Sequence, residues 1–149
     1  MEMPVFTIRG KNHRERGVDY GVQCKELIQG VLERYIRFFN GGHTAVSWDE
    51  AKVISKEFLP FIHSYSPELL DELEGIAQGA DVEFDDLLTL NSRSEAMTLV
   101  RRPPSDKEEL DGCSSVAVLP DASANGHTIL AQNWDTYTWQ EYGTVILQI

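Results

Sequence analysis

The chain has 149 residues, of which 42% are hydrophobic and 25% charged, and its formal net charge is −11 at pH 7. This composition is typical of a globular domain with a sizeable core. The acidic balance argues against nucleic acid and anionic membranes as partners, and no apolar run reaches the length of a membrane span.

The two cysteines, Cys24 and Cys113, are too few for a disulfide framework and favour a reducing compartment. The start of the chain lacks the basic and apolar stretches of a secretory signal. We therefore expect an intracellular protein, cytoplasmic or peroxisomal, with no targeting signal visible. Because His, Cys and acidic residues form no metal-ligand pattern, the sequence predicts no metal and no cofactor.

The chain begins with a predicted strand and a predicted long helix. Residues 4–9 are typical of a short strand with Phe6 and Ile8 on one face. From 14 to 39, apolar residues recur at three- and four-residue steps, which predicts one continuous helix. Cys24 lies on the apolar stripe of this helix, so we expect it to be a buried packing residue.

Three more helices are predicted before residue 100. Ser47 and Glu50 form a capping box for a helix that runs to about residue 65. Pro67 opens the next helix, which ends at Gly79. A last helix is predicted from 83 to about 97, with acidic residues at its N-terminus.

The character of the sequence changes near residue 101. The stretch 101–112 is polar, contains two prolines and has no periodicity, so we expect an exposed linker. After it, 114–119 and 128–132 predict the strands of a hairpin. Residues 143–149 alternate as a further strand, and because no turn or cap follows it, we expect the chain to be the N-terminal part of a longer protein.

Cys113 follows Gly112 where the linker meets the first hairpin strand. Glycine leaves room around its own carbonyl, so the Cys113 thiol is well placed to attack that carbonyl. Hydrolysis of the resulting thioester would release Cys113 as a new N-terminus, whose α-amine can serve as general base for its own thiol without a histidine. A small buried cysteine is the alternative interpretation.

The second hairpin strand ends in a polar cluster, Gln132-Asn133-Trp134-Asp135. Asn133 and Asp135 are two residues apart and therefore lie on one side of an extended segment. Asp135 is a candidate to hold the Cys113 α-ammonium or to orient its proton transfers, and its alternative role is to cap a turn.

Three further residues are candidates for supporting roles. Arg93 and Glu95 would line the floor of a cleft, and the alternative for both is an exposed helical ion pair. Trp134 would form one wall of an acyl pocket, and its alternative is packing beside the hairpin.

Several motifs together resemble the acyl-coenzyme A:6-aminopenicillanic acid acyltransferase family, a peptidase C45-like branch of the N-terminal-nucleophile hydrolases. The motifs of the hairpin region that carry the resemblance are Asp111-Gly112-Cys113-Ser114-Ser115, Asn125-Gly126-His127 and Gln132-Asn133-Trp134-Asp135. The helical segments that resemble the family are 15–21, 74–80 and 90–95. The Gly-Cys and Asn-Trp-Asp elements are the most specific parts.

The resemblance implies an α+β fold, a four-layered αββα sandwich that is only partly present in this chain. It implies cleavage between Gly112 and Cys113, so that a helical α-chain, 1–112, stays bound in one domain to a β-chain whose truncated start is 113–149. Cys113 matches the family's nucleophile and Asp135 the aspartate that supports it. The family's oxyanion-hole asparagine comes later in the chain, so we expect this piece alone to have no turnover.

The predicted function is that of a self-cleaving cysteine enzyme, an acyltransferase or amidohydrolase that acts on amide or thioester acyl groups through a Cys113 acyl-thioester. Its expected partners are a small-molecule acyl or amide substrate and its own C-terminal β-chain, with neither nucleic acid nor a membrane. Acyl-coenzyme A is a candidate acyl donor substrate. The alternatives are a non-catalytic or unprocessed relative that acts as a binding or structural protein, and a Cys-His protease, for which His127 in a predicted turn is a poor partner.

Overall fold

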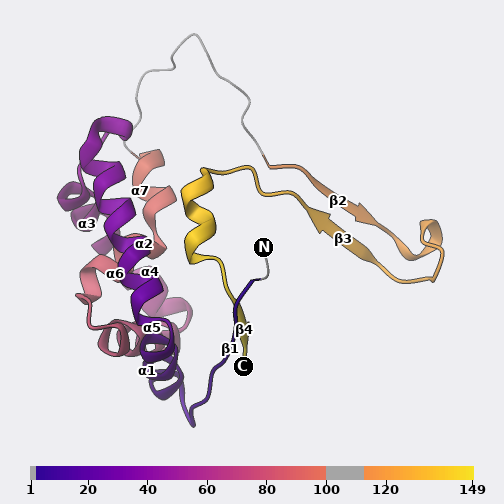
Figure 1. The fold of residues 1–149 in the computed structure, drawn as a ribbon, viewed down its shortest axis with the longest axis horizontal. Helices are drawn as coiled ribbons and strands as arrows, with labels where there is room; N and C mark the ends of the chain where they lie inside the picture. Colours follow the sequence, from indigo (N-terminus) through magenta and orange to yellow (C-terminus); the bar gives the residue numbers. More distant parts are fainter. Residues whose placement is uncertain (1–2, 100–112) are drawn as a thin grey trace. The chain divides into compact units, whose positions relative to one another are not determined.

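A computed structural model describes residues 3–99 and 113–149 of the chain. The contacts divide the chain into two units, which we call the helical unit (Met1–Arg102 with Tyr142–Ile149) and the hairpin unit (Pro103–Glu141). The predicted linker, including Gly112, lies outside the described residues. The described residues combine helices and strands, as expected for an α+β protein (Figure 1).

The helical unit consists of helices and one pair of short strands. Its helices are α1 (His13–Gln23), α2 (Lys25–Phe38), the π-helical turn η1 (Phe39–His43), α3 (Trp48–Lys56), α4 (Leu59–Tyr65), α5 (Pro67–Ala80), α6 (Phe84–Asn91) and α7 (Arg93–Leu99). The predicted first strand is present as β1 (Val5–Thr7), and the last predicted strand is present, shortened, as β4 (Ile146–Gln148). These two strands pair in parallel, with Val5 opposite Ile146.

The predicted long helix 14–39 is wrong in one respect, because it is divided into α1 and α2 at Cys24. The backbone of Cys24 leaves the helical region, with φ −107° and ψ 15°. The hydrogen bonds from Cys24 N–H to the Tyr20 carbonyl and from Ile28 N–H to the Cys24 carbonyl persist across the bend. The local apolar period therefore continues through a bend.

Two other predicted helices are also divided. The helix predicted to run to residue 65 breaks before α4, where Pro60 occupies the first turn; proline has no N–H to donate and its ring clashes with the preceding turn. The helix predicted over 83–97 breaks at Ser92, whose hydroxyl bonds back to the Leu88 carbonyl at 2.8 Å. Such back-bonding competes with the helical pattern and bends helices.

Part of the core of the helical unit lies between α2, α5 and α6, where a buried cluster contains Cys24, Ile28, Ala77, Ala80 and Leu87. The burial predicted for Cys24 is confirmed, since it is 2% exposed. Among the described helices, none combines the length and the apolar character needed to cross a lipid bilayer.

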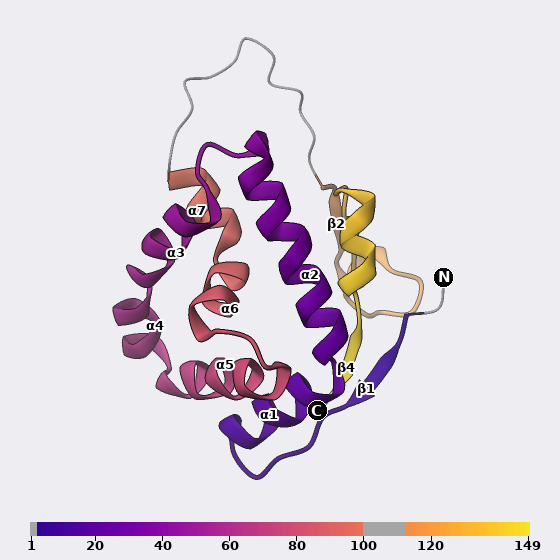
Figure 2. The ribbon, with the colours of Figure 1, turned by 60° about the vertical axis from the view of Figure 1, so that its left-hand side comes forward.

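Helices α1 and α5 touch through glycines, and they lie side by side at one end of the helical unit (Figure 2). A Cβ built on Gly75 would lie 3.0 Å from the Gly17 Cα, and a Cβ built on Gly79 would lie 3.0 Å from the Gly21 Cα. Because 17 faces 75 and 21 faces 79, the two helices run in the same direction. Glycines four residues apart share one helix face, so the two backbones are in direct contact.

The C-terminal segment is held on α2 by an aromatic residue. The Arg34 guanidinium lies 3.7 Å from the centroid of the Tyr142 ring, which is cation–π geometry. The ring also covers Gly30, where a Cβ would approach it to 2.8 Å. Gly30 therefore leaves the space that Tyr142 occupies just before β4.

In the hairpin unit, β2 (Ser115–Val118) and β3 (Ile129–Gln132) form the predicted hairpin. They pair antiparallel from Ser115–Gln132 to Val118–Ile129. The connection contains the short helix η2 (Pro120–Ala122), and Gly126 takes a positive φ of 70° in the turn. A second short helix, η3 (Thr138–Gly143), follows β3 and was not predicted.

The capping box of α3 makes a pH-dependent contribution to stability. The Ser47 N–H and hydroxyl both donate to a Glu50 carboxylate oxygen at 2.8 Å. The backbone bond, followed by the hydroxyl bond, lowers the pKa of Glu50 below its ordinary 4.5. A depressed folded-state pKa adds stability above the unfolded value that is lost as the pH falls through the folded value.

We therefore expect Glu50→Gln to lower the free energy of unfolding at pH 7 and to lower it less at an acidic pH below the folded-state pKa of Glu50, where the wild-type carboxylate also binds a proton. Urea unfolding of both proteins at the two pH values measures the difference. An equal loss at both pH values would mean that the charge of Glu50 contributes nothing to the capping box.

Candidate active site

Cys113 is positioned by the open end of the hairpin. Ser115 and Gln132 form the strand pair of β2 and β3 that lies nearest this open end. One residue further, the Asn133 N–H donates to the Ser114 carbonyl at 2.9 Å. The Ser114 N–H donates in return to the Asn133 side-chain Oδ1 at 2.8 Å. The Asn133 side chain thus takes the place of a backbone carbonyl and fixes the peptide that follows Cys113.

Asp135 is held next to this peptide by the same asparagine. Asn133 Nδ2 donates to both carboxylate oxygens of Asp135, at 3.1 and 3.0 Å. The Cys113 Sγ lies 3.9 Å from the backbone carbonyl oxygen of Asp135, at the long end of a thiol contact. The structure therefore brings together Cys113, Asn133 and Asp135, with the carboxylate turned to Asn133 and the thiol facing the Asp135 backbone.

The two thiols of the chain differ in exposure. Cys113 is exposed, whereas Cys24 is buried among the helices. Burial raises the pKa of the Cys24 thiol, which keeps it in the neutral form that reacts poorly. Of the two, Cys113 alone is accessible to a substrate or reagent in solution.

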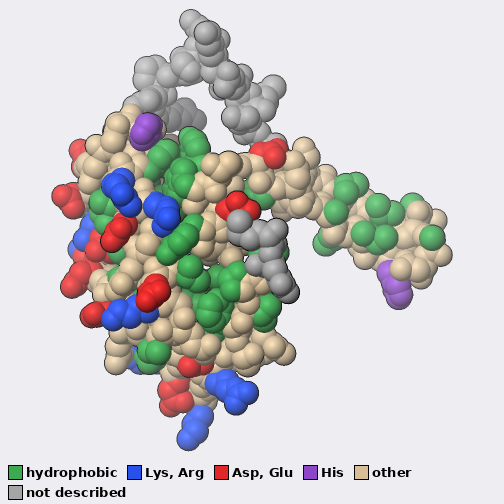
Figure 3. Space-filling view, viewed as in Figure 1, with side chains coloured by type: hydrophobic (Ala, Val, Ile, Leu, Met, Phe, Trp, Pro, Cys, Tyr) green, Lys and Arg blue, Asp and Glu red, His purple; other side chains and the backbone are tan. Residues whose placement is uncertain are grey.

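The aromatic residues after the cluster are largely open to solvent. Trp134 is 57% exposed. The rings of Tyr137 and Trp139 are stacked, with centroids 5.9 Å apart and planes 15° from parallel. Hydrophobic side chains also lie exposed along the hairpin (Figure 3). Gly112, the other half of the predicted cleavage site, lies outside the described residues.

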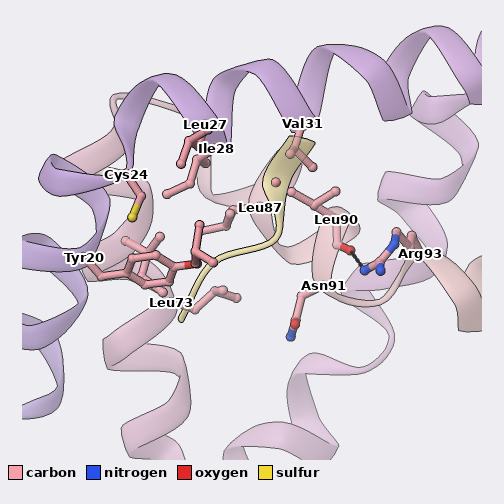
Figure 4. A pocket seen from close by; sticks show the side chains of 13 residues that line it. Tyr20, Cys24, Leu27, Ile28, Val31, Leu73, Leu87, Leu90, Asn91 and Arg93 are labelled. Atoms are coloured by element: carbon pink, nitrogen blue, oxygen red, sulfur yellow. Dashed lines mark hydrogen bonds between the residues drawn. The ribbon is translucent and has the colours of Figure 1, made fainter. Parts of the chain in front are cut away.

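A separate apolar pocket of about 220 Å³ opens in the helical unit between α2, α5 and α6 (Figure 4). Arg93 lines it and donates from Nη1 to the Leu90 carbonyl at 2.8 Å. Its guanidinium also lies 4.8 Å from the centroid of the Tyr35 ring. Glu95 is exposed on α7, two residues along the helix from Arg93, a spacing at which helical side chains do not face each other.

Tyr20 also lines this pocket beside Cys24. Burial, and then the neighbouring Cys24, raise the pKa of the Tyr20 phenol, so the pocket wall is neutral at that end. Within 3–99 and 113–149, His, Cys, Asp and Glu form no cluster of three or more that could hold a metal ion.

Sequence reasoning missed the bond between Ser114 and Asn133. The hairpin register alone indicates that the two residues are neighbours, because Ser114 lies opposite Asn133 when Ser115 pairs with Gln132. The alternation of apolar and polar residues does not indicate which oxygen of Asn133 accepts the Ser114 N–H. In the structure it is the side-chain Oδ1 and not the backbone carbonyl. The structure agrees with placing Asn133 and Asp135 on one side, because their side chains bond to each other.

The curated proteins similar to this chain include a hydrolase and an acyltransferase. One is a beta-alanyl-dopamine/carcinine hydrolase of Drosophila melanogaster, 28% identical over 123 residues that cover 78% of this chain and 30% of that protein. The other is the 40 kDa form of an acyl-coenzyme A:6-aminopenicillanic-acid-acyltransferase of Emericella nidulans, 29% identical over 136 residues that cover 88% of this chain and 35% of that protein.

No family model matches the chain, which spans about a third of the length of the curated relatives it matches. The similarity to these two proteins extends over most of the chain. The resemblance of this chain to the acyl-coenzyme A:6-aminopenicillanic acid acyltransferase family is thereby confirmed.

Proposed function

We propose that this chain belongs to an enzyme that transfers or hydrolyses acyl groups, and that Cys113 is its nucleophile. One relative is named as a hydrolase and the other as an acyltransferase, which supports chemistry at an amide or thioester carbonyl. The observation that carries the assignment to Cys113 is its exposed thiol beside the hydrogen-bonded Asn133–Asp135 pair.

The first step of the proposed mechanism is self-cleavage. The Cys113 sulfur attacks the carbonyl carbon of Gly112, the C–N bond between the two residues breaks, and the Cys113 nitrogen takes up a proton. Water then hydrolyses the thioester, which leaves a carboxylate on Gly112 and a free thiol and α-amine on Cys113. We propose that the two pieces remain bound as α- and β-chains of a four-layered αββα sandwich.

In turnover, the α-amine of Cys113 takes the thiol proton and the thiolate attacks the acyl carbon of a small-molecule substrate. The leaving amine or thiol departs with the proton, and the acyl-thioester passes to water in a hydrolase or to an amine in an acyltransferase. From Cys113 to Ile149 the sequence contains no Lys or Arg. The α-ammonium that forms when the new α-amine takes the thiol proton would therefore be the nearest cation to the thiolate along this segment, and an adjacent cation stabilises a thiolate.

Asp135 is proposed to hold that α-ammonium near the thiol. Its backbone carbonyl already faces Cys113 Sγ, which supports a position within reach of the new N-terminus. Acyl-coenzyme A appears in the name of one relative, so we include it among the candidate acyl donors as a substrate.

The intact mass of the full-length gene product tests the proposal. We expect two pieces divided between Gly112 and Cys113, with the second beginning Cys-Ser-Ser-Val. Cleavage should occur in the native protein and stop in denaturant, because the attack depends on the fold. A cut after Arg101 or Arg102 would indicate an external protease. A stable single chain would favour a binding or structural protein instead.

A further inference from the structure

We infer that Asn133 is the positioning residue of the Cys113 site, an inference that rests on the proposed function. Its one side-chain amide reaches both halves of the site: Oδ1 accepts the N–H of the residue after the nucleophile, and Nδ2 donates to the Asp135 carboxylate. No other described side chain contacts both Ser114 and Asp135 in this way.

The first half of this role concerns the nucleophile. Asn133 holds Ser114 by two bonds, one from its own N–H to the Ser114 carbonyl and one from the Ser114 N–H to its Oδ1. With both backbone groups of Ser114 bonded, the backbone that carries Cys113 has a defined direction just before the start of β2. Attack on a carbonyl is sensitive to such placement, since misplacement by about 1 Å costs on the order of 100-fold in rate.

The second half concerns the position of the Asp135 carboxylate. Asn133 Nδ2 donates to both of its oxygens at nearly equal distances, which holds the plane of the carboxylate. The remaining titratable side chains in the described part of the hairpin unit are Cys113, whose Sγ faces the Asp135 carbonyl, and the four residues Asp121, His127, Tyr137 and Glu141. Asn133 is thus the donor that holds the Asp135 carboxylate in place.

The link between the two residues can be observed in the wild-type protein without any activity. In full-length protein labelled with 15N-asparagine, the side-chain amide signal of Asn133 should move with pH as Asp135 titrates, and Asp135→Ala should remove the movement. Asn125, whose side chain accepts the His127 N–H in the hairpin turn at 3.2 Å, provides a control signal from the same unit.

The variant Asn133→Asp tests whether Asn133 positions Asp135 without removing the acceptor that holds Ser114 in the hairpin. It keeps an acceptor for the Ser114 N–H but loses the donor to Asp135 and places a second carboxylate beside it. Two adjacent carboxylates resist ionising together, so one of them keeps its proton to a higher pH than Asp135 does in the wild type. We expect the acid limb of the pH profile of kcat to move up by about one pH unit, with KM changed by less than about twofold.

Asn125→Asp is the matched control, because it makes the same chemical change in the hairpin turn. We expect its profile to coincide with that of the wild type. An Asn133 signal that ignores Asp135, or an Asn133→Asp profile that coincides with that of the wild type, would overturn the inference while leaving Cys113 as nucleophile. A wild type that never cleaves would remove the proposed function itself, and with it a role for Asn133 in the reaction.

Discussion

Replacing Cys113 by Ala in the full-length protein is expected to abolish self-cleavage and to reduce turnover by at least about four orders of magnitude, because no other group supplies the attacking sulfur. Intact mass spectrometry measures the cleavage, and release of product from an amide or thioester substrate measures turnover. The exposed position of Cys113 means that the substitution should leave the fold unchanged.

Cys24→Ala is the matched control, since Cys24 is the other cysteine of the chain. It is 2% exposed in the core of the helical unit, so its truncation is expected to cost about 1 kcal/mol of stability. Cleavage should continue in this variant. A Cys113→Ala protein that is still cut between Gly112 and Cys113 and remains active would remove Cys113 from the mechanism.

Placing a methyl group between α1 and α5 is expected to destabilise the helical unit strongly. A Cβ at Gly21 would lie 2.3 Å from the Ile76 carbonyl oxygen and 2.7 Å from the Ala80 nitrogen. Both are backbone atoms, so no side-chain rotation relieves the clash and the helices must separate. Alanine gains about 1 kcal/mol in helix propensity, but we expect Gly21→Ala to lose about 3 kcal/mol net.

Urea or thermal unfolding of the full-length protein measures this loss. Gly41→Ala is the control, because among the described residues its Cβ would meet the His43 side chain, at 3.2 and 3.4 Å, and no backbone atom. That variant should lie within about 0.5 kcal/mol of the wild type. Equal stability of Gly21→Ala and the wild type would show that the glycines do not bring the two backbones into contact.

The motifs that defined the candidate site were local, which is why they could be predicted. A glycine before Cys113 at the start of a strand and a carboxylate two residues after Asn133 are patterns over a few residues. The hairpin that brings them together follows from alternation and from the Asn125-Gly126 turn. Strands that follow each other along the chain usually pair, so the surroundings of Cys113 can be predicted from the sequence.

The bends in the helices could not be predicted from apolar spacing. The apolar period of residues 14–39 continues through Cys24 although the chain bends there. The spacing reports which side of a helix is buried and carries no information about the direction of its partner. Pro60 and Ser92 are local causes of two other breaks, and both residues are visible in the sequence. The prediction followed the apolar periodicity and extended each helix through the break.

The sequence by itself determined the mixture of helices and strands, the burial of Cys24, and the hairpin that carries Cys113 and Asp135, because each depends on spacing or on turn chemistry within about twenty residues. The tertiary structure alone decided that glycines of α1 and α5 meet, that β1 pairs with β4 across 141 positions of sequence, and that one amide of Asn133 serves both Ser114 and Asp135. Those features require segments or side-chain atoms to meet in space, and a one-dimensional pattern does not specify which of several compatible partners is chosen.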